Sequence, residues 1–410
     1  MTKTRSFWIS LCLINLCIVA FFGFCLRSKI LFTIPFVNYR NFLSAHSHFA
    51  FSGWAGLALM TLLIYDVLPG SLSQKKIYQR ILAGVEISSL GMALTFPFFG
   101  YNAITIFFST LYIVVAVVFA YVFLKDVLSV SLHKTIKLLC FTAIASLIVS
   151  FLGTLGLVYI LFAQYNNSIL YRDSIYVFLH FQYNGFFTVA VFALAFNYLI
   201  QKGNTITKNG RLFSLFLCLS IVPSLFLALL WHNLVLFYVF AAIGCLLMIL
   251  SLVFLLSFLR QLSHKIVFAS SFVRVFWVFT ILSFCLKMLL NIGTIFPQLG
   301  NAVYGDRPVI IGFLHLVFLG FLTFYIFSVI LQSDRFIPHT TSAGYPFVLF
   351  SAGIIANEIV LMLQGLGVLL KTSSPVFMWL LWATAIMLFS GALLIVLSRY
   401  RLVRAQKKPY

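Results

Sequence analysis

The sequence predicts an all-α integral membrane protein that spans the bilayer twelve times. Of its 410 residues, 63% are hydrophobic and only 8% are charged, whereas a soluble domain is about half apolar and a quarter charged. Apolar runs of about 18 residues or more recur along the whole chain, and each is long enough to cross a membrane as a helix. We see neither a soluble domain nor an internal repeat, so residues 1–410 are expected to form a single membrane domain.

Charged and turn residues divide the apolar runs into twelve predicted spans. They cover approximately 7–25, 44–68, 80–99, 103–124, 138–163, 174–200, 212–232, 235–259, 273–296, 308–331, 346–370 and 375–398. The shortest connections are Gly100-Tyr101-Asn102, after the third span, and His232-Asn233, after the seventh. Turns this short predict that the spans on either side form antiparallel hairpins.

The distribution of basic residues predicts the orientation of these spans. With the N-terminus inside, the cytoplasmic segments carry 20 Lys and Arg residues and the outer loops carry 6, while Lys287 lies within a span. Cytoplasmic loops are enriched in Lys and Arg, so both termini are expected in the cytoplasm. The net charge of +20 then faces anionic membrane lipid, and a nucleic acid partner is not expected.

Five of the eight histidines are predicted to lie at one depth, near the outer face. His46 and His48 begin the second span, His180 and His315 lie seven residues into the sixth and tenth, and His232 ends the seventh. Seven helical residues cover about 10 Å. An imidazole inside a membrane needs a partner, and it is a common ligand of haem iron and of metal ions. We therefore predict a buried haem or metal centre; the alternative is that these rings are hydrogen-bonded within the bundle. The other three, which we expect to be solvated in cytoplasmic loops, are His133, His264 and His339.

This pattern of helices and histidines resembles subunit I of the haem–copper oxidases. In that family twelve helices carry the ligands on helices II, VI, VII and X, near the outer face. The chain length and the spacing His46-x-His48-x4-Gly53-Trp54 resemble even more the smaller NnrS-type relatives, which are reported to bind haem and copper and are linked to nitric oxide stress. The resemblance implies a protein of the bacterial inner membrane.

The resemblance also implies one haem b held by two histidines. His315 corresponds to the ligand on the tenth span, and His46 or His48 to the ligand on the second. Side chains two residues apart on a helix point about 200° apart, so only one of the pair can face the haem. We favour His46, because it follows the small residue Ala45. Arg307, beside Asp306, is a candidate partner for a haem propionate because Arg binds carboxylates bidentately, and Arg40 is a second.

A copper site is implied at His180, which matches the ligand on helix VI, together with His232, which remains from a His-His pair on helix VII. Tyr183, one turn from His180, is a candidate donor of a proton or an electron there. The chain departs from the oxidases in further ways: Phe313 replaces the ligand of a second haem, Gln182 replaces a glutamate, and residues 235–259 lack the lysine of the eighth helix. An oxygen-reducing proton pump is therefore not expected, and whether the protein is an enzyme stays open.

The predicted function is haem-based handling of electrons, or of nitric oxide or oxygen, near the outer face, with a redox subunit or a quinol as partner. The alternative is a twelve-helix secondary transporter that uses Glu86, Lys287 and Glu358 as coupling residues, two of which (Lys287 and Glu358) lie at similar depth and could pair. A third possibility is an oxidase homologue that keeps the fold and one haem but acts in assembly or sensing.

Overall fold

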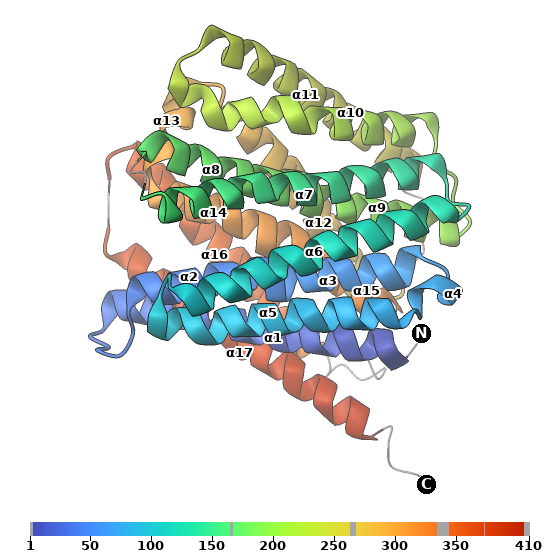
Figure 1. Ribbon diagram of the computed structural model, residues 1–410, viewed down its shortest axis with the longest axis horizontal. Coiled ribbons are helices and arrows are strands. Elements are labelled where there is room, and N and C mark those ends of the chain that lie inside the picture. The colour runs from blue at the N-terminus through green and yellow to red at the C-terminus, as the bar shows by residue number, and fades with distance from the viewer. Residues whose placement is uncertain (1–2, 165–166, 263–267, 334–343, 373, 406–410) are drawn as a thin grey trace.

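The computed structural model describes residues 3–164, 167–262, 268–333, 344–372 and 374–405, and all regular structure in these ranges is helical (Figure 1). The first six spans are formed by α1 (Lys3–Leu31); α2 (Tyr39–Phe49) with η1 (Ala50–Gly56), α3 (Leu57–Leu62) and η2 (Leu63–Val67); α5 (Lys76–Phe99); α6 (Ala103–Ser129); α7 (Lys134–Phe162); and α8 (Ser168–His180) with η3 (Phe181–Phe187) and α9 (Thr188–Gln201). The other six are formed by α10 (Lys208–Ser224) with η4 (Leu225–His232); α11 (Val235–Leu262); α12 (Ser271–Gly293); α14 (Arg307–His315) with η5 (Leu316–Thr323) and α15 (Phe324–Ser333); α16 (Tyr345–Leu369); and α17 (Val376–Ala405).

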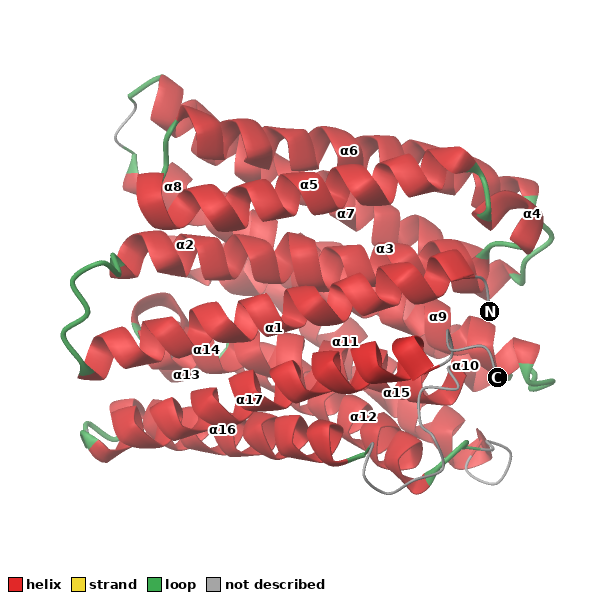
Figure 2. Cartoon of the chain, turned by 90° about the horizontal axis from the view of Figure 1, so that it is seen from below, coloured by secondary structure: helices red, strands yellow, loops and turns green. Residues whose placement is uncertain are grey.

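The described residues contain 12 helices that are long and apolar enough to cross a membrane, which confirms the predicted fold class. Two short helices, α4 (Gly70–Ser73) and α13 (Pro297–Gly305), lie in connections and were not expected. The helices run along one axis of the molecule, with connections at its two ends (Figure 2). We call the end where α1 begins and α17 ends the terminus end, and the opposite end the histidine end (Figures 1 and 2).

Both predicted hairpins are present. Helices α5 and α6 pack together, as do α10 and α11. The first turn has Gly100 at a φ of +58°, and the side chains of Asn102 and Thr105 cap the start of α6. The second turn passes through Asn233 at a φ of +54°, a left-handed conformation that asparagine tolerates better than most residues.

Three spans meet at the centre of the bundle, and each contains a π-helical segment. The segments η1, η3 and η5 each begin one or two residues after a histidine. One phenylalanine from each segment contacts the other two: the ring centroids of Phe51, Phe187 and Phe318 are 4.6–5.7 Å apart. Trp54 of η1 also donates a hydrogen bond to Thr323 of η5. These contacts hold the second, sixth and tenth spans together.

These three spans share the short pattern His-x4-Gly-aromatic. It reads His48 to Trp54, His180 to Phe186, and His315 to Phe321. In a π-helix the carbonyl of residue i faces residue i+5. Thr188 and Thr323 donate their hydroxyls to carbonyls five residues earlier, at 2.5 and 2.8 Å. π-Helical turns are rare and are frequent at functional sites.

The central spans are tightly packed at the terminus end and loosely packed at the histidine end. None of the nine residues of α14 is fully buried, and only Ser174 and His180 are buried in α8. The continuations of the same spans, through η3 and α9 and through η5 and α15, are almost entirely buried. The histidines therefore lie where packing changes from loose to dense.

Candidate functional site

His46 and His315 form the first candidate site, between α1, α2 and α14. Nδ1 of His46 donates to the carbonyl of Val19 at 3.0 Å, and Nδ1 of His315 donates to the carbonyl of Ile311 at 2.8 Å. The donation of Nδ1–H places the lone pair of each neutral ring on Nε2. Neither Nε2 has a hydrogen-bond partner among the residues that the structure describes. Metal-ligating histidines commonly use this arrangement, in which the second nitrogen is held by a carbonyl.

A cation belongs to the same site. His315 lies within electrostatic range of both His46 and Arg27, and His46 lies within range of Arg27. A Cβ at Gly23 would lie 3.3 Å from Cε1 of His46, so the imidazole rests directly on the backbone of α1. Val19, Gly23 and Arg27 are four residues apart and share one face of that helix. Three residues of α1 thus lie beside the histidine pair: Val19 accepts a hydrogen bond from His46, Gly23 leaves room for its ring, and Arg27 places a cation within electrostatic range.

The two arginines predicted to bind a propionate lie at the surface of the bundle. Arg307 and Arg40 are both exposed, close to the starts of α14 and α2. Arg27 was missed because the sequence reasoning counted it only as an outer-loop charge. Its spacing from Val19 and Gly23 is visible in the sequence, but it becomes informative only when His46 is known to face α1.

His48 points to a different neighbour from His46. Its Nδ1 donates to the carbonyl of Ser44 at 2.8 Å, and its ring lies 4.6 Å from that of Phe96 in α5 and 6.0 Å from that of Tyr101. The two histidines therefore contact α1 and α5 respectively. Only His46 shares a site with His315.

His180 lies in a separate buried network. Its Nε2 donates to the carbonyl of Ile221 at 2.8 Å, while the amide of Asn184 donates to Nδ1 at 3.2 Å. Asn291 of α12 donates in turn to Asn184 at 3.1 Å. Both ring nitrogens of His180 are thus occupied by protein groups.

His232 does not share a site with His180. Its Nε2 lies 3.0 Å from the carboxylate of Asp173, and the neighbouring Arg172 stacks over the ring of Trp231 at 4.8 Å. Asp173 precedes His180 by seven residues of α8, which is about 10 Å. The described part of the chain contains no group of three His, Cys, Asp or Glu side chains that could hold a metal ion. These residues do not fit a copper site, and we derive no step from one.

Tyr183 lies between the His180 network and Phe313. Its ring centroid is 6.4 Å from that of His180 and 5.4 Å from that of Phe313. A small cavity of about 60 Å³ adjoins these three residues and Asn291. The resemblance would put a second haem ligand at position 313. Phe313 instead makes an aromatic contact with Tyr183.

Lys287 and Glu358 do not pair. The Lys287 ammonium donates to the hydroxyl of Thr188 and to the carbonyl of Tyr183, between the rings of Phe284 and Phe321. Glu358 accepts a hydrogen bond from its neighbour Asn357.

Of the three histidines predicted to be solvated, His133 is exposed at the start of α7, and His264 and His339 lie outside the described residues.

We expect Lys287→Met to leave the protein folded, with the free energy of unfolding changed by no more than about 1 kcal/mol. The Thr188 hydroxyl keeps the Tyr183 carbonyl as its acceptor, and methionine has a similar length. No described carboxylate is paired with Lys287, so its removal strands no opposite charge. The measurement is thermal unfolding in detergent, with Lys287→Glu as the comparison that should be strongly destabilised. A comparable loss in both variants would contradict this expectation.

No protein-family model matches the chain, and no curated protein matches it. The histidine pair therefore has to be judged by its own chemistry. Two imidazoles from different spans, each held at Nδ1 and open at Nε2, with Arg27 in range, fit the donor set of a bis-histidine haem.

Proposed function

We propose that this protein binds one haem b through His46 and His315 and acts in electron transfer, or in handling nitric oxide or oxygen, in the membrane. The observation that carries the proposal is that these two histidines, on α2 and α14, lie within electrostatic range of each other, each with Nε2 available. When bound, a haem supplies one-electron oxidation and reduction at its iron.

The residues of the chain would hold and orient that group. The carbonyls of Val19 and Ile311 fix the rotation of the two imidazoles and raise their basicity as ligands. The Arg27 guanidinium is suited to a carboxylate such as a propionate. The loose packing of α14 places incompletely buried surface beside His315.

We further propose that both termini lie in the cytoplasm of a bacterium and that the histidine end faces outward. The distribution of Lys and Arg supports this orientation. The proposed electron donor is a redox subunit or a membrane quinol. With both ring nitrogens of His180 occupied and no second ligand beside it, the proposal includes no copper.

The test is the reduced-minus-oxidised absorbance spectrum of the protein purified after expression with added haem precursor. We expect the bands of a low-spin haem b and about one haem per chain by pyridine haemochrome assay. A haem-free preparation under these conditions would overturn the proposal. It would favour the alternative of a secondary transporter, with Glu86, Lys287 and Glu358 as its coupling residues.

A further inference from the structure

Buried polar atoms without hydrogen-bond partners are concentrated on the first three spans. The residues that the structure describes include eight such side-chain atoms, and five of them lie on α1, on α3 and η2, and on α5. These five are Asn15 Oδ1, Thr61 Oγ1, Tyr65 OH, Glu86 Oε1 and Ser89 Oγ. Buried polar groups are nearly always paired with protein or with ordered water. Five unpaired atoms in one region therefore indicate a place where water or protons enter the bundle.

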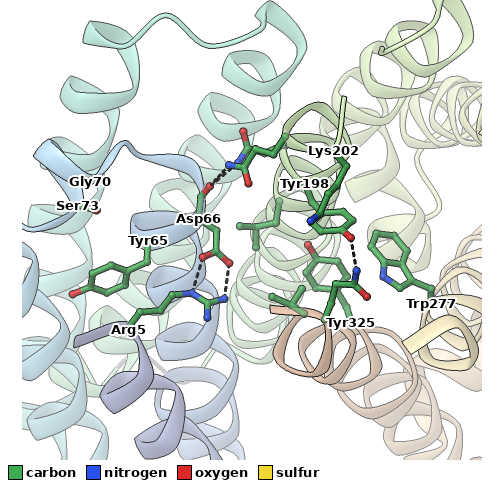
Figure 3. A pocket seen from close by; sticks show the side chains of 14 residues that line it. Arg5, Tyr65, Asp66, Gly70, Ser73, Tyr198, Lys202, Trp277 and Tyr325 are labelled. Carbon is green, nitrogen blue, oxygen red and sulfur yellow. Dashed lines mark hydrogen bonds and ion pairs between the residues drawn. The ribbon is translucent and has the colours of Figure 1, made fainter. Parts of the chain in front are cut away.

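A polar cavity at the terminus end adjoins one of these five residues, Tyr65. It has a volume of about 620 Å³ and is bordered by α1, η2, α9, α12 and α15 (Figure 3). Arg5 and Asp66 form a bidentate ion pair at 2.7 and 2.9 Å beside it, and Lys202 lies at its rim. The ring of Tyr65 lies at its edge, with the hydroxyl pointing away from Asp66 (Figure 3). A cavity of this size and polarity accommodates many water molecules.

The unpaired hydroxyls continue from this cavity toward the middle of the membrane. Thr61 precedes Tyr65 by one turn of the second span, so both side chains lie on one face. Thr61 lies beside the thiol of Cys12, and Cys12 is within electrostatic range of Glu86. Thr61 and Tyr65 are one helical turn apart, roughly 5 Å, a distance that one water molecule bridges.

Glu86 is the last group in this series. One of its carboxyl oxygens and the amide oxygen of Asn15 lack a hydrogen-bond donor. The amide of Asn15 donates to Glu86 Oε2 at 2.7 Å and to the carbonyl of Gly53 at 2.8 Å. This leaves Glu86 Oε1 and Asn15 Oδ1, both buried acceptors, without a partner. No described Lys or Arg forms an ion pair with Glu86. A carboxylate without a cation is costly inside a membrane, whereas a proton on Oε1 removes the charge and supplies the missing donor.

We propose that Glu86 is a proton-binding site loaded from the cavity at the terminus end through the hydroxyls of Tyr65 and Thr61 and the water between them. A hydronium ion in the cavity gives up one proton, an O–H bond forms at Glu86 Oε1, and water is returned. The Cys12 thiol on α1 is a titratable group within electrostatic range of Glu86, and the Tyr112 hydroxyl of α6 packs against Gly56 of η1. This proposal does not depend on the binding of haem.

Infrared spectroscopy of the full-length protein in lipid films tests this route. We expect a protonated carboxylic acid band that disappears in Glu86→Gln and persists in Glu358→Gln. Transfer to D₂O should shift this band. Tyr65→Phe and Thr61→Val should slow the shift about tenfold, the factor expected for one lost hydrogen bond along the route. Both variants keep the size of the side chain, and circular dichroism confirms that they are folded.

Two matched controls determine the direction of entry. Ser351→Ala removes an unpaired buried hydroxyl from α16, far along the chain, and should leave the exchange rate unchanged. Ser89→Ala removes the unpaired hydroxyl one turn beyond Glu86 toward the histidine end and should also have no effect. The absence of a carboxylic acid band assigned to Glu86 would overturn the proposal. Slowed exchange in Ser89→Ala, with normal exchange in Tyr65→Phe and Thr61→Val, would overturn the proposed route.

Discussion

Replacement of either His46 or His315 by alanine is expected to abolish the low-spin haem spectrum, whereas replacement of His48 should leave it intact. A bis-histidine haem needs one imidazole from each side. His46 and His315 are in electrostatic range of each other with Nε2 available, while the ring of His48 lies against Phe96 of α5. The measurement is the reduced-minus-oxidised spectrum at equal protein concentration, together with the haem content per chain.

Chemical rescue separates the loss of a ligand from the loss of the fold. Free imidazole added to His46→Gly or His315→Gly should restore the low-spin bands, because it can occupy the space that the side chain leaves. His48→Ala is the matched control, since it removes the same side chain two residues away. If His48→Ala lost the haem and His46→Ala kept it, the assignment of the ligand to His46 would be wrong.

The twelve spans could be predicted from the sequence because hydrophobicity and length alone determine which segments cross a membrane. The ends of the spans were less predictable, because local capping decides them. Asn167 caps α8 by accepting from the backbone of Leu170, so the sixth span begins at Ser168 and not at residue 174. As a result His180 is the thirteenth residue of its helix, and Asp173, nearer the end, pairs with His232. The two histidines predicted to share a copper site thus have different partners: His232 lies beside Asp173, and His180 beside Ile221 and Asn184.

The choice between His46 and His48 illustrates a different limit. Helical geometry predicts that they face opposite sides, but it does not say which neighbour lies on each side. That depends on α1, which brings Val19, Gly23 and Arg27 to His46.

The π-helical segments could not be predicted from hydrophobic periodicity, because a period of 3.6 residues does not distinguish them from α-helix. The recurring His-x4-Gly-aromatic pattern was the available signal.

The glycine in this pattern is expected to be essential in η3, where the span approaches α7 closely. A Cβ at Gly185 of η3 would lie 2.3 Å from Cβ of Ser146 in α7, and Ser146 is buried. Gly185→Ala therefore forces α7 and η3 apart. Overpacking of a dense core costs about 1–3 kcal/mol, and here it would also displace the His180 network. We expect a clear fall in the thermal unfolding midpoint in detergent.

A second substitution on the facing helix makes this prediction specific. The atom that clashes is the Cβ of Ser146. Ser146→Gly removes this atom, so the double variant with Gly185→Ala should recover most of the lost stability. Gly365→Ala is the control for adding a methyl group to a helix, because its Cβ would lie 3.5 Å from Val309, an ordinary contact. That variant should be neutral or slightly stabilised, since alanine favours the helix by about 1 kcal/mol over glycine. If the double variant were no more stable than Gly185→Ala, the close approach of η3 and α7 would not be the reason for a glycine at this position.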